Sequence, residues 1–572
     1  MSRAAHSLPL AAIPLTLLFA LAPLSQAVAQ VASAAPAPRA GDILHEVPTP
    51  STMPALPDAS PLNAAAPAAK APAVNFVLKR FDVRGATVLT PQQIQALAEP
   101  YVGQTLGETE LSALIGALRK RYEDKGYGLA SIGFPSQDVS QGVLKVDVVE
   151  PKLARVQIPL GADAPVTADR VNGLMGFFDL HAGGLLNTAS LERVMFALND
   201  MPGVQAKAAL SPSGDEGIYN LSIQVTPRRS WDASLSVDNH GVGYAGRWRG
   251  TGLLRLNNPL GMGDNLDLQT MLSNAGGVKV GRVAYELPVG YTPARVSVAY
   301  AKVDYTLGGQ YADQDAHGSA DVAEANLSYP LMRSRSRTLM ARIGYESKGL
   351  TDYLQGNELF TSKKHINAVL GGLNYESRDA WMGGGFNGLS AQFHWGRLRL
   401  DSELDQLIEA LQGDQGKAGS FGKVELQWSR LQAISRKVSL YGSLSQQMST
   451  RNMDPAEKMT LGGPRGVRAY PTAEGASDEA TLFNGELRYW IDRNWTVFAL
   501  YDWAKGHRNR EVSPASFSAN DVQLRAAGLG VAANFPDVVT LKATVAWRGT
   551  RLPETAPGND KARVFVQALH SF

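Results

Sequence analysis

The sequence predicts a transmembrane β-barrel of 16 antiparallel strands preceded by two small α+β units, and three observations lead to this class. Residues 231–572 contain about 16 segments in which apolar and polar residues alternate, separated by turns rich in Gly, Asp, Asn and Pro. One strand about every 21 residues exceeds the spacing of soluble sandwiches and fits tilted strands joined alternately by short turns and long loops. The N-terminus has the character of an export signal, and the chain ends on Phe572.

The export signal comes first in the chain. Arg3 provides a positive start, an apolar run covers about residues 8–24, and Ala-Val-Ala follows at 27–29. This order is typical of a signal peptide, so we expect one over residues 1–29. A transmembrane anchor is the alternative, but the run is short and is broken by Pro14 and Pro23. No later segment offers the ~18 uninterrupted apolar residues of a membrane-spanning helix.

Composition and motifs argue against several function classes. The 55 basic and 53 acidic residues nearly balance, whereas a nucleic-acid binder normally has a basic excess. The absence of cysteine excludes disulfides, thiolate zinc sites and iron–sulfur clusters. "GVGYAG" at 241–246 fits G-x-G-x-x-G, but a further strand follows it instead of the helix that a dinucleotide site needs, so we expect a hairpin loop. We predict no enzyme, no cofactor, no metal and no nucleic-acid partner.

Residues 30–74 are rich in Ala and Pro and predict an extended linker, because such a composition cannot bury a core. The segment "AGDILHEV" at 40–47 is a candidate short helix within it.

Two α+β units of order β-α-α-β-β follow, at residues 75–150 and 151–227, as a tandem repeat. In the first unit, Thr90 caps a helix that starts with Pro91, and a second helix ends at Gly126. One face of that second helix is apolar through Leu111, Leu114, Ile115, Leu118 and Tyr122. In the second unit we expect helices near 166–177 and 188–200, the latter capped by Thr188 or Ser190.

The barrel segment, residues 231–572, ends with an alternating strand. Its apolar parity runs through Val564 and Val566 to Phe572, with His570 as a weak point on that face. A terminal aromatic residue fits a closing strand whose ring sits at the membrane interface.

The stretch "LGGPRGVRAYP" at 461–471 contains the candidate site. On a strand two segments later, Asp502 shares its parity with Phe498 and Leu500, so its carboxylate points into the lumen and calls for a guanidinium. A loop folded back into the barrel would supply Arg468; a surface loop with solvated arginines is the alternative. The glycines that permit such a tight path are Gly462, Gly463 and Gly466.

This layout, with "GGPRGVRAYP" and the "NGELRYW" that follows, resembles the outer-membrane transporters of two-partner secretion systems (TpsB type), the family of the haemolysin and filamentous-haemagglutinin exporters. The resemblance implies two POTRA (polypeptide-transport-associated) domains and a 16-stranded barrel. It places Val467, Arg468 and Tyr470 at the tip of a sixth extracellular loop, with the arginine meeting Asp502 on the inner wall of strand 13. It also implies a pore-plugging helix near 40–47.

Two residues depart from the family pattern. Ala469 and Ala504 stand where the family's motifs have glycine, so a turn with positive φ at 469 would be strained.

The function implied by the resemblance is export, without ATP, of a large β-helical partner protein from the periplasm to the surface of a Gram-negative cell. POTRA domains would capture the unfolded client by strand addition near 129–150 and 204–225, and the inserted loop would gate the barrel. Outer-membrane lipid and the barrel assembly machinery are further implied partners. An outer-membrane protein assembly factor and a passive porin are the alternatives; the former usually has more POTRA domains, and the latter does not need any.

Overall fold

The computed structural model describes residues 37–45, 47, 75–353, 361–412, 416–512, 519–555 and 560–572. The predicted signal peptide and most of the predicted linker lie outside these residues. The candidate helix of the linker is present as α2 (Ala40–Leu44). None of the helices among the described residues is long and apolar enough to cross a membrane.

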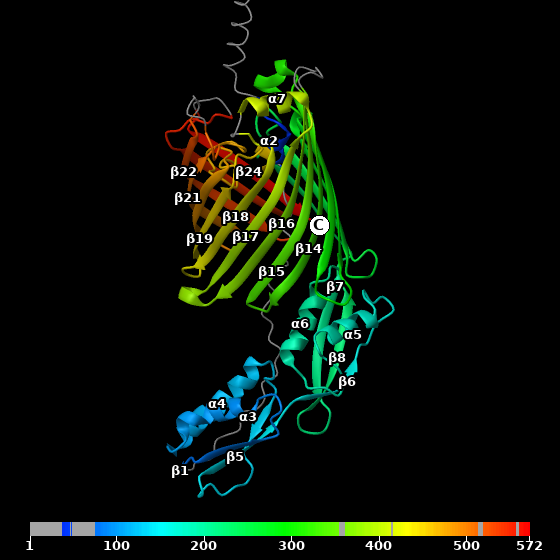
Figure 1. Ribbon diagram of the computed structural model, residues 1–572, viewed down its shortest axis with the longest axis vertical. Helices are drawn as coiled ribbons and strands as arrows, with labels where there is room; N and C mark the ends of the chain where they lie inside the picture. The colour runs from blue at the N-terminus through cyan, green and yellow to red at the C-terminus, as the bar shows by residue number, and fades with distance from the viewer. Residues whose placement is uncertain are drawn as a thin grey trace, which may run out of the picture. The chain divides into compact units, whose positions relative to one another are not determined.

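The chain from Trp231 onward forms a closed barrel of 16 antiparallel strands, β9 to β24, as the alternating pattern predicts (Figure 1). Each strand pairs with its neighbours in sequence, and β24 pairs with β9. The strands are β9 (Trp231–Asp238), β10 (Arg249–Asn257), β11 (Asn265–Ser273), β12 (Val278–Pro288), β13 (Arg295–Thr306), β14 (His317–Arg333), β15 (Arg337–Tyr353), β16 (Ser362–Asp379), β17 (Gly385–Leu400), β18 (Gly419–Ala433), β19 (Val438–Ser449), β20 (Glu479–Trp490), β21 (Trp495–His507), β22 (Asp521–Phe535), β23 (Val539–Arg548) and β24 (Ala562–Ser571).

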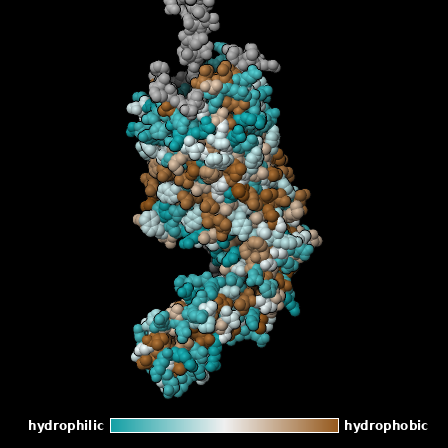
Figure 2. Space-filling view, in the orientation of Figure 1, coloured by the Kyte–Doolittle hydropathy of each residue, from teal (hydrophilic) through white to brown (hydrophobic). Residues whose placement is uncertain are grey.

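Side chains alternate between the outer face and the lumen along these strands. In β21, Phe498, Leu500 and Asp502 are buried, whereas Val497 and Tyr501 are exposed, as the parity of the sequence predicts. The exposed apolar residues form a band over the barrel, with hydrophilic residues above it (Figure 2). Such a band is the surface that a lipid bilayer covers.

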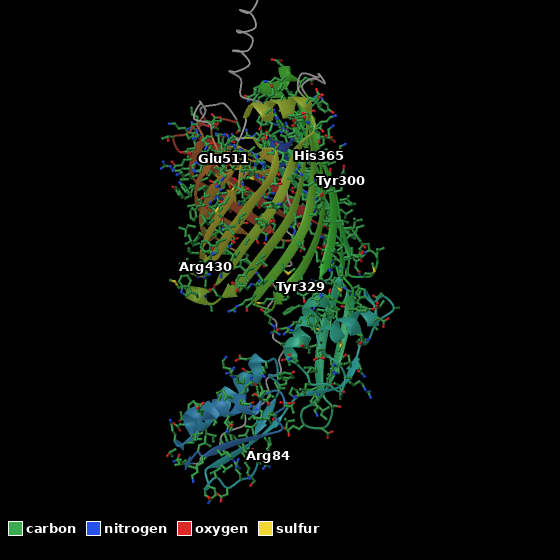
Figure 3. The ribbon with its side chains drawn as sticks, viewed as in Figure 1. Arg84, Tyr300, Tyr329, His365, Arg430 and Glu511 are labelled. Carbon is green, nitrogen blue, oxygen red and sulfur yellow. The ribbon has the colours of Figure 1, made fainter. Side chains whose placement is uncertain are left out.

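The two ends of the barrel differ in their connections. Short turns, such as 334–336 between β14 and β15, join strands at the end where Figure 3 shows Tyr329 and Arg430. The opposite end, near His365 and Glu511, has the long loops. The loop between β19 and β20, residues 450–478, is the sixth at this end, and "GVGYAG" lies in its first loop, between β9 and β10.

The barrel closes through a short seam. β24 and β9 pair over five residues each, from Gln567 opposite Asp238 to Ser571 opposite Ser234. The Phe572 amide extends the seam by donating to the Ala233 carbonyl at 2.9 Å. Phe572 is 45% exposed at the end of this closing strand, and the position of its ring at a membrane interface stays a prediction.

The first α+β unit contains a three-stranded sheet of order β2-β5-β4 and a separate pair, β1 with β3. The single strand expected at its start is divided into two short strands. Its elements are β1 (Phe76–Val77), β2 (Arg80–Arg84), α3 (Pro91–Ala98), β3 (Thr105–Leu106), α4 (Glu108–Asp124), β4 (Ser131–Gly133) and β5 (Val143–Val149). The Thr90 cap, the buried face of α4 and the turn at Gly126 (φ 88°) agree with the sequence predictions.

A buried carboxylate ties this unit together. Glu150 accepts hydrogen bonds from the amides of Thr87 (2.7 Å) and Val88 (2.8 Å) and from the hydroxyl of Tyr122 (2.9 Å). Burial alone would raise the pKa of Glu150, but these hydrogen bonds to the carboxylate outweigh it and hold the pKa below its usual value of 4.5.

Glu150→Gln is expected to loosen the turn at residues 87–90, because an amide cannot accept all these donors. We expect a cost of about 1–3 kcal/mol at pH 7. Since the folded pKa is depressed, the carboxylate's contribution is present above pH 4.5 and is lost as the pH falls through the folded pKa. Hydrogen exchange of the full chain checks this: faster exchange at 87–90 is expected at pH 7, and equal rates in both proteins would contradict it.

The second α+β unit has the same order of elements around a sheet of order β6-β8-β7. Its elements are β6 (Lys152–Gln157), α5 (Ala168–Phe177), α6 (Thr188–Asn199), β7 (Val204–Pro212) and β8 (Ile218–Pro227). The predicted cap of α6 is wrong. The cap is Asn187, which accepts from the Ser190 amide at 3.0 Å, while the Thr188 hydroxyl donates to the Gly126 carbonyl. Asn187 precedes the helix and is itself a preferred capping residue.

The predicted sheet edges need a correction. β5 and β8 lie in the middle of their sheets, because each has a parallel neighbour on one side and an antiparallel one on the other. The edges are β2 and β4 in the first unit and β6 and β7 in the second, so only part of 129–150 and 204–225 is available for strand addition.

Candidate gate in the barrel lumen

The loop 450–478 folds back into the barrel. Val467, Arg468 and Tyr470 at its tip are 0%, 4% and 0% exposed. The path is tight: a Cβ on Gly462 would lie 2.2 Å from the Pro471 carbonyl oxygen, and one on Gly466 would lie 2.4 Å from that of Leu461. Gly463 has φ 95°, a conformation that favours glycine. The three glycines therefore permit the fold of the tip.

Arg468 meets Asp502 in a bidentate contact. Its Nε donates to Oδ2 at 2.8 Å and its Nη2 to Oδ1 at 2.7 Å, and the Arg468 amide also donates to Oδ2, at 3.0 Å. Asp502 is fully buried. The remaining guanidinium nitrogen, Nη1, donates to Glu486 on β20, and Asn484 donates to Asp502 at 2.8 Å. A buried ion pair with these additional hydrogen bonds leaves little unsatisfied charge.

The two alanines that depart from the family pattern fit the observed backbone. Ala469 does not have a positive φ; the left-handed residues of this loop are Gly463, Ala473 and Gly475. Ala504 is fully buried in an apolar cluster with Tyr470 and Leu500. The strain considered for position 469 is therefore absent.

The tip is also tied to neighbouring loops by contacts that the sequence does not predict. Tyr470 donates from its hydroxyl to the Arg551 carbonyl at 3.1 Å, and Thr472 donates to the His240 carbonyl at 2.6 Å. Glu474, fully buried, accepts from the Thr555 amide at 2.9 Å. These contacts join residues far apart in the chain, and no local pattern indicates them.

Helix α2 lies among the barrel strands (Figure 1), in contact with β13, β14 and β15. Its first amide, at Ala40, donates to the inward Asp352 carboxylate at 2.7 Å. Ile43 is 1% exposed, and Gly41 packs so closely on the turn η8 (Pro455–Glu457) that a Cβ would lie 2.6 Å from the Ala456 nitrogen. The helix thus rests on the same loop that carries Arg468.

Ion pairs fasten that loop to the barrel wall at three strands. Glu457 pairs with Lys348 of β15 at 2.7 Å and with Lys423 of β18 at 2.9 Å, and Asp454 pairs with Lys364 of β16 at 2.9 Å. The sequence analysis missed this cluster. The available signal was a lysine on the inward parity of three strands, but parity alone does not identify the partner.

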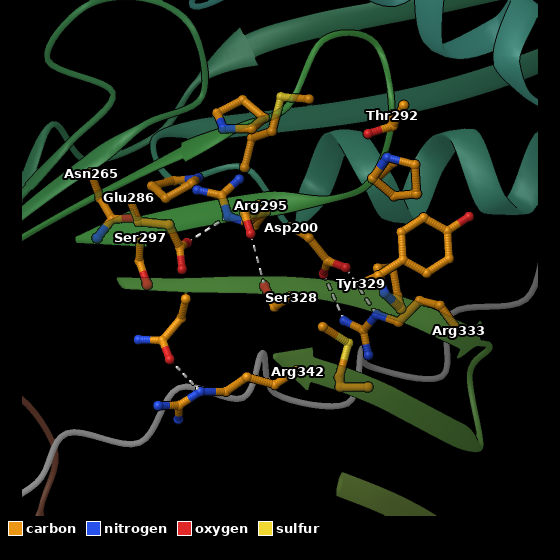
Figure 4. Close-up of a pocket in the computed structure, with 18 of the residues that line it drawn as sticks. Asp200, Asn265, Glu286, Thr292, Arg295, Ser297, Ser328, Tyr329, Arg333 and Arg342 are labelled. Atoms are coloured by element: carbon orange, nitrogen blue, oxygen red, sulfur yellow. Dashed lines mark hydrogen bonds and ion pairs between the residues drawn. The ribbon is translucent and has the colours of Figure 1, made fainter. Parts of the chain in front are cut away.

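A cavity of about 610 Å³ lies at the short-turn end, between α6 and the inner ends of strands β10 to β15 (Figure 4). Asp200, directly after α6, pairs with Arg333 at 2.6 Å, and Glu192 of α6 pairs with Arg335 at 2.7 Å, which fastens the helix to the turn between β14 and β15. Deeper in the cavity, Arg342 donates to Asn326 at 2.8 Å. Charged and apolar side chains together line this cavity, which lies at the mouth formed by the short turns.

Metal binding has no structural support in the part of the chain that is described: no group of three or more His, Asp or Glu side chains there could hold an ion.

Comparison with known proteins decides the family. Residues 217–531, more than half of the chain, match the family described as haemolysin secretion/activation protein ShlB/FhaC/HecB. The chain belongs to this ShlB/FhaC/HecB family. Residues 76–151 match the ShlB-type POTRA domain, which is the first α+β unit.

Relatives of this chain are named as transporters. The heme/hemopexin transporter protein HuxB of Haemophilus influenzae is 23% identical over 507 residues, covering 87% of this chain and 88% of its own length. The outer membrane transporter CdiB of Escherichia coli O6:K15:H31 is 26% identical, covering 74% and 70%. The structure of CdiB from Escherichia coli superposes with a TM-score of 0.68 at 21% identity, over 99% of this chain and all of that one.

These findings confirm the family, the fold class and the transport function that the sequence predicts. The barrel is an outer-membrane transporter of a Gram-negative bacterium, and its POTRA domains lie in the periplasm. The short-turn end therefore faces the periplasm, and loop 450–478 is the sixth extracellular loop. The relatives do not favour an assembly factor.

Proposed function

We propose that this transporter exports one large secreted protein through its lumen, and that loop 450–478 and α2 together form the gate. The observation that carries the proposal is the buried Arg468–Asp502 pair, which holds a loop tip inside the bore. α2 occupies a second part of the bore and rests on the same loop. Both must shift before a polypeptide passes.

Charge pairs stabilise the closed state of the gate. If Arg468 and Asp502 separate and no other group takes the partner's place, each charge stays buried without a counter-charge, at a cost of about 3–5 kcal/mol. An entering client that offers new polar partners lowers this cost. Transport therefore needs no nucleotide at the barrel, and folding of the client outside the cell makes the passage directional by burying its apolar surface there.

The POTRA domains capture the client before it enters. β7, nine residues long, is a free edge of the second sheet, and an extended client segment adding to it gains backbone hydrogen bonds. In this proposal the exposed apolar band contacts outer-membrane lipid, and the barrel assembly machinery inserts the chain after its signal peptide has been removed.

Secretion of a candidate client tests the export proposal. A long, repetitive secreted protein encoded beside this chain is expressed with and without it, and the client is measured outside the cell. We expect secretion only with the chain present. Leakage of small solutes without client export would indicate a porin, and loss of other barrel proteins from the membrane would indicate an assembly factor.

Deletion of residues 151–227 tests the capture step. We expect a barrel that still inserts, because β9 to β24 close on themselves, and a loss of client binding and secretion. Membrane localisation and single-channel conductance report insertion. Normal secretion by the shortened chain would show that the second unit is dispensable for capture.

A further inference from the structure

A second cavity lies beside the loop tip. It has a volume of about 220 Å³, and its wall includes Arg465 and Arg468 from the loop, Lys542 and Thr544 from β23, and Gln567 from β24. The cavity is distinct from the larger one at the short-turn end, with which it shares no lining residue. Every one of these five side chains can donate a hydrogen bond.

Two of these cations are not engaged by carboxylates. Arg465 and Lys542 are exposed to the bore, and within the described part of the chain neither has an ion pair. The Lys542 ammonium lies over the Phe498 ring, 5.4 Å from its centroid, which orients the amine without neutralising it.

The neighbouring carboxylates are already paired with arginines. Asp502 is held by Arg468, and Glu486 is shared between Arg468 and Arg488, the latter at 2.7 Å. Among the described residues of this region, four cations, counting Lys542 and Arg465 with these two arginines, therefore face two carboxylates. The surplus positive charge is concentrated in this cavity, where low-dielectric walls focus its field.

We propose that Arg465 and Lys542 form a luminal anion site that receives the carboxylate side chains of the passing polypeptide. The site rests on the export function proposed above. A carboxylate is the fitting ligand because a guanidinium and an ammonium converge on one small cavity with hydroxyl and amide donors beside them. The client is the fitting source because the cavity opens in the bore, beside the gate.

The location gives the site a role in opening. Arg468 lines the same cavity, so a carboxylate held by Arg465 and Lys542 lies beside the guanidinium that anchors the loop. It becomes an alternative partner for Arg468 in place of Asp502 and Glu486. Acidic segments of the client thereby loosen the loop as they arrive.

Binding of a labelled hexaglutamate peptide to the purified full chain tests the site. Fluorescence anisotropy at low salt compares the wild type with Arg465→Gln, Lys542→Gln and the double variant. The matched control is Lys505→Gln, which removes a charge from the outer face of β21. Because the double variant removes both charge-assisted donors of the site, we expect affinity to fall by about a hundredfold or more. The control should bind as the wild type does.

Two further measurements keep the outcome decisive. The reversal potential of the channel in a salt gradient should shift toward cation selectivity in the double variant, which reports the lost charges without any peptide.

Inorganic phosphate is the competing probe. Equal peptide affinity in the wild type and the double variant would overturn the site, and binding of inorganic phosphate with no binding of the peptide would overturn the client as its source. If the wild type secretes its client and the double variant secretes equally well, the site plays no part in export, while the export function stands.

Discussion

Arg468→Ala is expected to give a barrel that folds and inserts but secretes poorly and conducts ions more freely. The substitution leaves Asp502 buried without a guanidinium, at a cost of about 3–5 kcal/mol in the gate, while Glu486 keeps its pair with Arg488. The 16-stranded ladder does not depend on this contact, so the barrel remains. Because 1.4 kcal/mol changes an equilibrium about tenfold, we expect the open fraction to rise by at least about tenfold. Secretion falls because an unanchored tip occupies several positions in the client's path.

The controls separate the gate from general damage. Arg493→Ala removes an exposed arginine from the turn between β20 and β21 and should leave conductance and secretion unchanged. Asp502→Ala should reproduce the Arg468→Ala phenotype, and the double variant should be no worse than either, since both remove one interaction. Conductance in planar bilayers and client release measure the effect. Wild-type behaviour of both single variants would remove the gate from the mechanism.

Much of this gate could be predicted from the sequence because its signals are local. Alternation along 231–572 gives the strands, and the parity of Asp502 with Leu500 points the carboxylate inward. The tip residues were found through their motif and its glycines. The structure brings Arg468 and Asp502 together, and it places Ala469 in an unstrained conformation.

The rest depends on long-range register. Glu457 and Lys348 are 109 residues apart, and nothing near either residue indicates the other. The contact between Ala40 and Asp352 spans 312 residues. The α6 cap was misassigned for a different reason: Asn187, Thr188 and Ser190 are all good capping residues, and only the start of the helix decides among them. The sheet edges likewise follow from pairing order, which strand patterns do not contain.

Helix α2 and loop 450–478 support each other through direct contacts. Gly41 packs on Ala456, and the loop that contains Ala456 continues to Glu457, held by two lysines, and then to Arg468. A shift of the helix therefore removes contacts that hold the loop in place, and a shift of the loop removes the surface on which the helix packs. In the proposed gate, we therefore expect opening only when both sets of contacts are released.

Gly41→Leu is expected to displace α2 from its position against η8 and to increase the conductance of the closed channel severalfold. A Cβ at this position would lie 2.6 Å from the Ala456 nitrogen and 3.0 Å from an Asp454 carboxylate oxygen, and η8 cannot retreat because Glu457 is fastened to the wall. Gly116→Leu is the matched control, since a Cβ there meets nothing within 4 Å. Single-channel recording measures the effect, and protection of the α2 amides from hydrogen exchange reports whether the helix has left. If Gly41→Leu conducts like Gly116→Leu and α2 stays protected, the bore is not closed by the helix, and the loop alone must account for gating.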